Sequence, residues 1–375
     1  MRILQLSSAR TYGGGERHFA DLSNALSERG HDVYAALSPA SPLRPQLARL
    51  SESHIVTLPL RNALDLASAT RLARFIRERR IEIVHAHLAR DYPLAAYASR
   101  RAGSVPFIIT RHVPFAMSGL HRFTLSNAAR VIAVSEGVAR GLSARRIFPD
   151  EKIRVIPNGI SVATLDHALR DFDRDGFRQR LSAGAPLITG TVGELSPVKG
   201  QEEFVRAAAT IIRQENFKDA QFLIIGDDRS RGGETRARLE SLIAEHELQG
   251  HVRLLGHVSE LTPLISSLDL YVSASRAEAF GLATLEALMC GVAVVSTATD
   301  GAREMIDDGV TGKLVPVGDA ASLARAMLHL LQNGDERARI SERAREESRA
   351  RFGLERMVEA TESVYREAVA AVPVG

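Results

Sequence analysis

Strand-like apolar runs alternate with helix-like segments along almost the whole chain, and this alternation restricts the fold more than any other feature. Continuous apolar runs such as Leu187–Gly193 are typical of strands that are buried on both faces. The sequence therefore predicts an α/β protein whose parallel sheets are covered by helices on both faces. In the first half, strands are expected at Arg2–Ser8, Asp32–Leu37, Ile55–Leu58, Ile83–His87, Val105–Thr110, Val131–Ser135 and Ile153–Pro157.

The chain is long enough for two domains, since its 375 residues can form two hydrophobic cores of ordinary size. The alternation stops in a polar stretch and restarts at Leu187. We therefore expect an N-terminal domain over residues 1–168, a linker or hinge over 169–184 and a C-terminal domain over 185–352.

Composition indicates a protein of the cytosol. The single cysteine, Cys290, excludes an internal disulfide and agrees with a reducing compartment. The N-terminus passes into a Gly-rich stretch without the apolar core of a signal peptide, and no apolar run approaches 18 residues. We expect a cytoplasmic protein, with peripheral attachment to the inner face of the cell membrane as the alternative.

Positive charge is concentrated in the first half of the chain. Residues 1–168 contain 23 Lys and Arg against 13 Asp and Glu, whereas the remainder contains 25 against 32. No zinc spacing or aromatic-rich basic strand accompanies the charge, so we expect no nucleic-acid partner. An anionic acceptor or an anionic membrane surface remains. The arginines of the predicted helix 67–79 fit either partner, or simply a solvated face.

Two carboxylates, Glu278 and Glu286, stand eight residues apart in the stretch 275–291. In one unbroken helix they would lie ~80° out of line and ~12 Å apart along the axis, too far apart to hold one small group. Gly281 supplies a break, after which Leu282–Cys290 reads as a helix. The free N–H groups at its start favour an anion, so the stretch suits a sugar attached to a diphosphate and a ribose.

Other polar residues follow predicted strands, where open α/β sheets bind ligands. A Gly-rich turn, Gly13-Gly14-Gly15-Glu16, follows the first strand and leads into a helix from about residue 17. His112 follows another strand, and either ligand contact or a structural histidine fits it. Lys199, one of only four lysines, lies in the Gly-rich loop after Leu187–Gly193 and suits a diphosphate.

The pattern Glu278-Ala-Phe-Gly-Leu-x3-Glu286-Ala-Leu-x2-Gly resembles the Glu-x7-Glu signature of the retaining glycosyltransferases of family four. The resemblance extends over nearly the whole chain. It implies the GT-B fold, in which two Rossmann-like doubly wound domains face each other across a cleft. It also implies that a C-terminal helix, here 353–375, crosses back to the first domain, which binds the acceptor.

The resemblance also implies roles for individual residues. Glu278, His112 and Lys199 would be catalytic. The substrate-binding set would be Gly14, Gly15, Glu16, Glu194, Lys199, His257, Val258, Phe280, Gly281, Leu282 and Glu286. Glu194 departs from the family, which has Arg at this position to hold the phosphates. Glu194 therefore turns away, pairs with a basic neighbour, or contacts sugar or acceptor.

The activity that the resemblance implies is transfer of a sugar from a nucleoside diphosphate sugar to a hydroxyl of a glycan or lipid-linked acceptor. UDP is the commonest donor nucleotide in the family, and lipopolysaccharide or another surface polysaccharide would be the product. We expect no cofactor and no metal, because no carboxylate or cysteine cluster joins His85 and His87 in sequence. The alternatives are a non-catalytic sugar-nucleotide-binding protein and a GT-B phosphorylase or epimerase.

Overall fold

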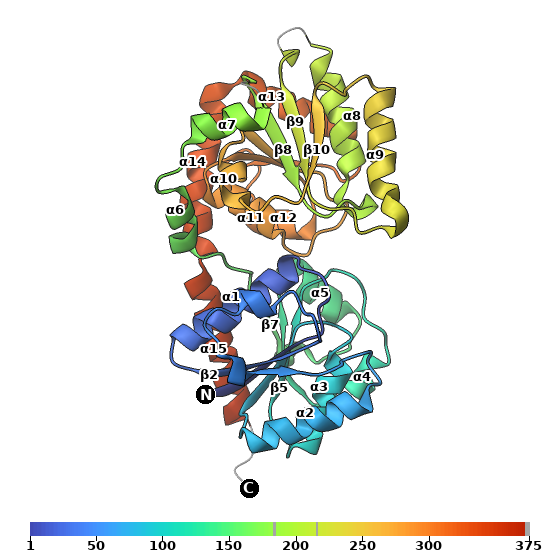
Figure 1. Cartoon of the computed structure of the whole chain (residues 1–375), viewed down its shortest axis with the longest axis vertical. Helices are drawn as coiled ribbons and strands as arrows, with labels where there is room; N and C mark the ends of the chain where they lie inside the picture. Colours follow the sequence, from blue (N-terminus) through green and yellow to red (C-terminus); the bar gives the residue numbers. More distant parts are fainter. Residues whose placement is uncertain (183–184, 215–216, 372–375) are drawn as a thin grey trace. The chain divides into compact units, whose positions relative to one another are not determined.

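The computed structural model describes residues 1–182, 185–214 and 217–371 (Figure 1). The chain forms two compact units, one of Met1–Gly159 with Leu354–Gly375 and one of Ile160–Gly353. We expected the first domain to continue to residue 168 and a linker to follow over 169–184. Residues 160–182 instead belong to the second unit, where they form the helices α6 (Val162–Leu169) and α7 (Arg174–Ser182). Residues 183–184 of the expected linker lie outside the described residues.

An ion pair fixes α7 to the second unit. Arg178 Nη2 lies 3.0 Å from Asp269 Oδ2, and both side chains are largely buried. The guanidinium of Arg178 also donates to the backbone carbonyl of Ser267 at 2.6 Å. The segment resembles a linker in sequence because its residues are polar, but these polar groups are partly satisfied by the second unit.

A parallel sheet of seven strands forms the centre of the first unit, in the order β3-β2-β1-β4-β5-β6-β7. The strands are β1 (Arg2–Ser7), β2 (Asp32–Leu37), β3 (Ile55–Thr57), β4 (Ile83–Ala86), β5 (Phe107–Arg111), β6 (Ala128–Ala133) and β7 (Ile153–Val155). The helices are α1 (Gly14–Glu28), α2 (Leu66–Glu78), α3 (Tyr92–Arg101), α4 (His121–Thr124), α5 (Glu136–Ala144) and α15 (Leu354–Ala370).

The first helix begins earlier than the sequence suggested. Gly14, Gly15 and Glu16 were expected in a turn before the helix, but they form the first turn of α1. The backbone N–H of Arg17 already donates to the carbonyl of Gly13 at 2.9 Å. Glycines have low helix propensity, so tertiary context outweighs that preference here.

A parallel sheet of six strands forms the centre of the second unit, in the order β10-β9-β8-β11-β12-β13. The strands are β8 (Ile188–Val192), β9 (Gln221–Ile225), β10 (Val252–Gly256), β11 (Leu270–Ser273), β12 (Ala293–Thr297) and β13 (Lys313–Val315). Besides α6 and α7, the helices are α8 (Gln201–Ile212), α9 (Glu234–Glu245), α10 (Leu261–Ser266), α11 (Leu282–Met289), α12 (Asp300–Met305), α13 (Ala320–Gln332) and α14 (Gly334–Arg351).

Both sheets reverse their strand order once. The reversal lies between β1 and β4 in the first unit and between β8 and β11 in the second. The connections leave in opposite directions from such a point, so the carboxyl ends of its two strands stay open to a ligand. The residues predicted to be functional should therefore gather at these two places.

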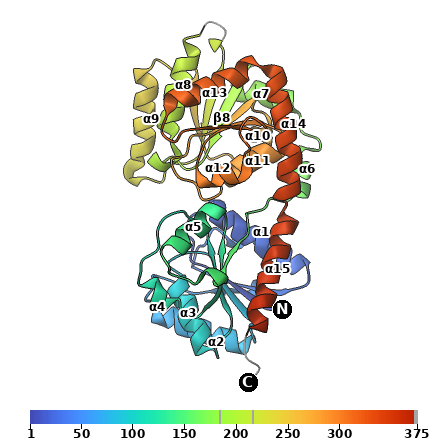
Figure 2. The ribbon, with the colours of Figure 1, turned by 180° about the vertical axis from the view of Figure 1, so that it is seen from behind.

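The last helix, α15, packs on the first unit (Figure 2). Its buried residues Met357, Val358, Val364 and Tyr365 join one core cluster with strand residues of the first sheet, among them Ile83. Its Glu362 faces Arg29, which follows α1. Residues 372–375 of the predicted crossing segment lie outside the described residues. Among those described, no helix has the length and apolarity that crossing a bilayer requires.

The carboxylate of Glu362 allows a test of how α15 is held. Arg29 Nε and Nη2 donate to its two oxygens at 2.9 and 3.0 Å, and His31 Nε2 lies 2.9 Å from Oε1. Glu362→Gln should lower the free energy of unfolding by about 1–2 kcal/mol, discounted because Arg29 is 40% exposed. Urea denaturation followed by circular dichroism measures the change.

The matched control is Glu359→Gln on the same helix. Its carboxylate is 61% exposed and lies 3.9 Å from Arg29, so its replacement should change stability little. Equal losses in both variants would contradict the conclusion that the contacts of Glu362 with Arg29 and His31 stabilise α15.

Candidate functional site

Lys199 and Glu278 meet in the second unit, where two loops leave the carboxyl ends of β8 and β11. Lys199 Nζ lies 2.5 Å from Glu278 Oε2, and the side chains are 30% and 21% exposed. The backbone N–H of Arg276 donates to the carbonyl of Val198 at 2.7 Å, so the backbones of the loops are also joined. Lys199 and Glu278 are 79 positions apart in sequence, and the strand reversal between β8 and β11 brings them together.

Glycine is required where these loops approach each other. Gly200 has a φ of +66°, and a Cβ there would lie 2.0 Å from the carbonyl oxygen of Ala274. A Cβ on Gly301, at the start of α12, would lie 2.4 Å from the carbonyl oxygen of Phe280, and the Gly301 N–H donates to the Glu278 carbonyl at 3.1 Å. The sequence did not predict that Gly301 supports the loop of Glu278.

The helix break between the two glutamates lies where the sequence placed it. Gly281 has a φ of +101°, and α11 begins at Leu282. Glu278 therefore lies in the loop and Glu286 in the second turn of the helix. Glu286 is 1% exposed, and Thr262 Oγ1 of α10 donates to its Oε1. His257 and Val258, both in the predicted substrate-binding set, lie in the loop between β10 and α10.

Glu194 pairs with a basic neighbour, one of the three possibilities that the sequence left open. Its Oε2 lies 3.5 Å from Nη1 of Arg229, and both side chains are more than a third exposed. Arg229 follows β9, so the neighbouring loop supplies the guanidinium at this edge of the sheet. Sequence reasoning missed Arg229, although its position four residues after the apolar strand β9 is a signal that could have found it.

Four histidines gather at the strand reversal of the first unit. His85 and His87 come from β4 and its end, His112 follows β5, and His18 is in α1. His87 Nδ1 lies 3.3 Å from His112 Nε2, and the His18 and His112 rings lie 4.6 Å apart. Gly15 lies beside them, since a Cβ there would be 3.5 Å from Cγ of His112. His112 is thus brought to the Gly-rich start of α1.

Buried polar partners hold His85 and His87. His87 Nε2 lies 2.7 Å from Oε1 of Gln5 on β1, and Gln5 Nε2 donates to the hydroxyl of Tyr365 at 3.0 Å. His85 Nδ1 lies 2.7 Å from the Tyr365 hydroxyl. His85 Nε2 lies 2.7 Å from Oγ1 of Thr110. Neither Gln5 nor Tyr365 was among the residues predicted from sequence, because an apolar strand and a helix face give no signal of such a network.

Burial keeps these histidines neutral. It lowers the pKa of His18 to about 4, a shift that the side chain of Asn158 partly opposes. Burial, with smaller contributions from the neighbouring histidines, lowers the pKa of His85 and His87 well below the usual value. The pKa of His112 is lowered in the same way, and Arg111 adds to the shift. The uncharged imidazoles can exchange hydrogen bonds without bringing a charge into the core.

His18, His87 and His112 have ligand atoms within 4.8 Å of one another, close enough in principle to share a metal ion. No carboxylate or thiolate belongs to this group of described residues. Arg111 is near enough to disfavour positive charge on His112, and it would oppose a divalent cation in the same way. This environment disfavours a metal centre. Within the group, His87 and His112 are hydrogen-bonded, whereas neither ring nitrogen of His18 has a hydrogen-bond partner among the described residues.

The depressed pKa of His18 predicts a pH dependence. The unfolded chain takes up a proton near pH 6.5, whereas folded His18 does so near pH 4. Stability from this group is therefore complete above about pH 6.5 and is lost as the pH falls toward 4, by roughly 3 kcal/mol. Calorimetric unfolding between pH 8 and pH 5 measures the loss.

His18→Gln should weaken the dependence of the free energy of unfolding on pH, because it removes the titrating group. His167→Gln, which replaces an exposed histidine of α6, controls for the loss of an imidazole. A wild-type curve that stays level down to pH 5 would contradict the prediction.

Two family models together match most of the chain. Residues 12–164 match the model of "Glycosyltransferase Family 4", and residues 173–347 match that of "Glycosyl transferases group 1". The first match includes the histidine cluster, and the second includes Lys199, Glu278 and Glu286.

Similar proteins match over nearly their full length. The chain is 26% identical over 371 residues to N-acetyl-alpha-D-glucosaminyl L-malate synthase of Bacillus anthracis, a match that covers 94% of this chain and 93% of that protein. It is 28% identical to a lipopolysaccharide core biosynthesis glycosyltransferase of Rhizobium meliloti, over 96% and 97% of the two chains.

Solved structures agree in fold. The crystal structure of Anabaena HepE in complex with UDP and glucose superposes with a TM-score of 0.84 at 21% identity, over 98% of this chain and 99% of that chain. Both the family and the fold predicted from sequence are confirmed. The chain belongs to the family-four, group 1 glycosyltransferases and has the two parallel-sheet α/β domains of the GT-B fold.

Proposed function

We propose that the protein is a retaining glycosyltransferase that uses a nucleoside diphosphate sugar, with UDP as the nucleotide. The observation that carries this proposal is the contact of Lys199 with Glu278 at the strand reversal of the second unit, next to the start of α11. One cation, one carboxylate and a set of free helix N–H groups lie together there. The structural neighbour HepE was crystallised with UDP-glucose, which supports UDP as the nucleotide.

The arriving diphosphate would exchange partners with the protein. Without ligand, the ammonium of Lys199 neutralises Glu278. A diphosphate would compete for that ammonium and accept hydrogen bonds from the N–H groups of Phe280, Gly281 and Leu282. Glu278 would then be free to accept hydroxyl groups of the sugar. Glu286, already an acceptor for Thr262, would take the ribose hydroxyls.

The proposed reaction breaks the bond between the sugar C1 and the diphosphate oxygen and forms a bond from C1 to the acceptor oxygen. The acceptor proton passes to the leaving diphosphate, so the charges balance. Lys199 and the start of α11 stabilise the charge that develops on the leaving group, and no metal is needed for that role. If the acceptor attacks on the face of the sugar from which the diphosphate departs, the anomeric configuration is retained. NMR of the product measures that configuration.

The pairing of Glu194 bears on the alternative of a non-catalytic sugar-nucleotide-binding protein. An unpaired carboxylate beside the diphosphate would have weakened donor binding. Its ion pair with Arg229 neutralises that charge and leaves a guanidinium at the same edge of the sheet. The proposal therefore assigns Arg229, together with Lys199, to the side of the site that receives phosphate.

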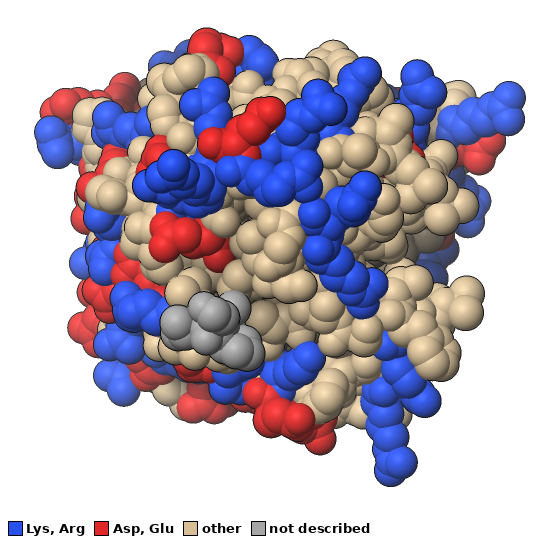
Figure 3. Space-filling model, turned by 90° about the horizontal axis from the view of Figure 1, so that it is seen from below, with Lys and Arg blue, Asp and Glu red and all other residues tan. Residues whose placement is uncertain are grey.

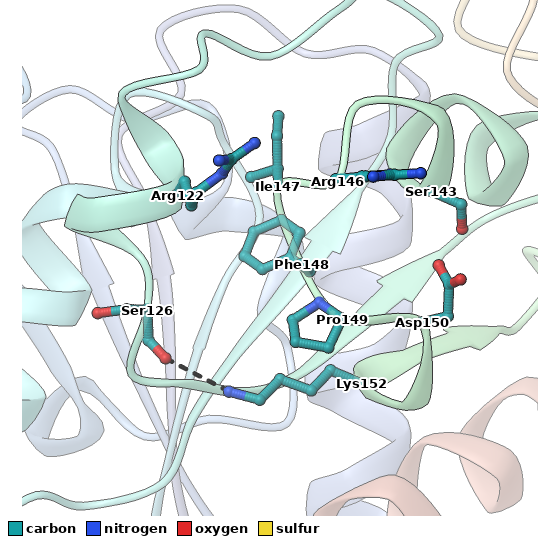
Figure 4. A pocket seen from close by; sticks show the side chains of 9 residues that line it. All are labelled: Arg122, Ser126, Ser143, Arg146, Ile147, Phe148, Pro149, Asp150 and Lys152. Carbon is teal, nitrogen blue, oxygen red and sulfur yellow. Dashed lines mark hydrogen bonds between the residues drawn. The ribbon is translucent and has the colours of Figure 1, made fainter.

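The acceptor we propose is a glycan or lipid-linked glycan, as in lipopolysaccharide synthesis, reached by peripheral contact with an anionic membrane. Lys and Arg side chains gather on the face of the first unit shown in Figure 3. Arg122 and Arg146 line a pocket of about 640 Å³ near the sheet edge of β6 and β7 (Figure 4). Leu120 and Phe123, on either side of Arg122, are 71% and 73% exposed. Charge and exposed apolar groups together suit a lipid surface.

The nucleotide test compares wild type with Glu286→Gln and Lys199→Ala. UDP at ~100 times its dissociation constant should add ~2.7 kcal/mol to the stability of the wild type. Each variant loses a charged hydrogen-bond partner worth about 1.5–3 kcal/mol, so UDP should bind roughly tenfold to hundredfold more weakly. Thermal unfolding with UDP, GDP and ADP, followed by calorimetric titration, measures both effects.

Glu240→Gln is the matched control, because this carboxylate pairs with Arg236 on the surface of α9. It should bind UDP as the wild type does. Loss of affinity in the control as well, or a wild type that no nucleotide stabilises, would contradict the donor assignment.

The membrane proposal predicts salt-sensitive binding to vesicles that contain phosphatidylglycerol. Each basic side chain near an anionic surface contributes about 1 kcal/mol, so the double variant Arg122→Gln/Arg146→Gln should bind roughly 30-fold more weakly. Binding of the wild type should fall as salt rises. Arg236→Gln/Arg238→Gln, on α9 of the second unit, controls for total charge. Sedimentation with vesicles measures the binding, and equal losses in both double variants would contradict the assignment of the surface.

A further inference from the structure

We propose that Tyr365 is a positioning residue that sets the tautomer of His112, so that Nδ1 of His112 accepts a hydrogen bond from a ligand hydroxyl. Tyr365 does not contact His112. It acts through Gln5 and His87, which link the last helix to the loop after β5. The identity of the ligand rests on the proposed function, whereas the tautomer does not.

The amide of Gln5 determines the proton of His87. Its oxygen faces His87 Nε2 at 2.7 Å and can only accept, so His87 Nε2 carries a proton. A neutral imidazole has one N–H, and Nδ1 of His87 therefore presents a lone pair. Nε2 of His112 lies 3.3 Å from that lone pair and must be the donor. Neutral His112 then has no proton on Nδ1.

Tyr365 determines which way the amide of Gln5 points. The amide nitrogen of Gln5 donates to the Tyr365 hydroxyl oxygen at 3.0 Å. Because the hydroxyl accepts from Gln5, we infer that its single proton is directed to Nδ1 of His85 at 2.7 Å and that Nε2 of neutral His85 donates to Oγ1 of Thr110. Reversing the amide would require the hydrogen bonds of Tyr365, His85 and Thr110 to reverse with it, so the Tyr365 hydroxyl couples the direction of the Gln5 amide to these partners.

Burial keeps every residue in this series of hydrogen bonds in its neutral form. Gln5, His85 and Tyr365 are 0% exposed, and His87 is 3% exposed. Burial lowers the pKa of the histidines and raises the pKa of Tyr365, so no member gains or loses a charge near pH 7. Within this series of hydrogen bonds, only the position of each proton can therefore change.

The lone pair of His112 Nδ1 is left for a ligand. This atom is buried and has no hydrogen-bond partner within the described residues. An unsatisfied buried acceptor costs about 1–3 kcal/mol, which a donated hydroxyl would recover. His112 lies beside Gly15 at the strand reversal, where a sugar hydroxyl is the expected donor. A ligand that offers only an acceptor at this point would be rejected.

The direct test is NMR of protein labelled with 15N in its histidines, in which long-range proton–nitrogen couplings distinguish the two tautomers. His112 of the wild type should carry its proton on Nε2 alone. Tyr365→Phe removes the hydroxyl with little change of shape, so Gln5 can turn and His112 should become a mixture of tautomers. Assignment uses the signal that disappears in His112→Asn.

Tyr92→Phe is the matched control. Tyr92 is 1% exposed in the same unit, and its hydroxyl donates to the backbone carbonyl of Thr110 outside the chain of hydrogen bonds. It should leave His112 unchanged. Should Tyr365→Phe not fold, Gln5→Met breaks the chain at its second member and should give the same mixture. His112 protonated on Nδ1 in the wild type, or unaltered in both variants, would overturn the proposal.

Kinetics separate this inference from the proposed function. In an assay with active substrates, Tyr365→Phe should lower kcat about tenfold, and it should reduce the penalty for a substrate that lacks the hydroxyl which His112 accepts. A merely structural role would lower stability without changing that penalty. If the tautomer shifts as expected but no nucleotide sugar reacts, the proposed function fails and the positioning role stands. An active enzyme whose tautomer never shifts would overturn the positioning role and leave the proposed function standing.

Discussion

Parallel strand pairing with one reversal of strand order is the constraint on which both candidate sites depend. In each unit it leaves the carboxyl ends of two neighbouring strands free of a crossing connection, β1 and β4 in one and β8 and β11 in the other. The side chains of both sites, far apart in sequence, meet at these strand ends. Lys199 reaches Glu278 in the second unit, and Gln5 reaches His87 in the first.

Sequence periodicity was sufficient for the fold because most strands are short apolar runs and nearly every crossover contains an α-helix. The break at Gly281 was also predictable, since two carboxylates eight residues apart need one and glycine permits the positive φ. The change of unit after Gly159 was not predictable. The polarity of 160–182 is that of a linker, and only contacts such as Arg178 with Asp269 show that it belongs to the second unit.

Partners from distant segments were the hardest to predict within the sites. His112 and Lys199 were found because glycines and strand ends mark their places. Arg229 also follows a strand end, but its role depends on Glu194, which is 35 residues away in sequence. No sequence signal distinguishes Tyr365, since it lies on an amphipathic helix like any core tyrosine. Its importance comes from Gln5, 360 residues away.

The two units stabilise the polar groups of their candidate sites in different ways when no ligand is bound. In the second, charges without a ligand are matched within the site, since Lys199 pairs with Glu278 and Glu194 with Arg229. Those partly exposed pairs cost little to separate, so a polyanion can replace one member. In the first, the histidines are too deeply buried to carry charge, and selectivity has to come from the direction of hydrogen bonds. A partly exposed cation that can change partners suits recognition of a charged diphosphate. A buried, neutral set of hydrogen bonds suits recognition of an uncharged hydroxyl, because a donor or acceptor left unpaired there is costly.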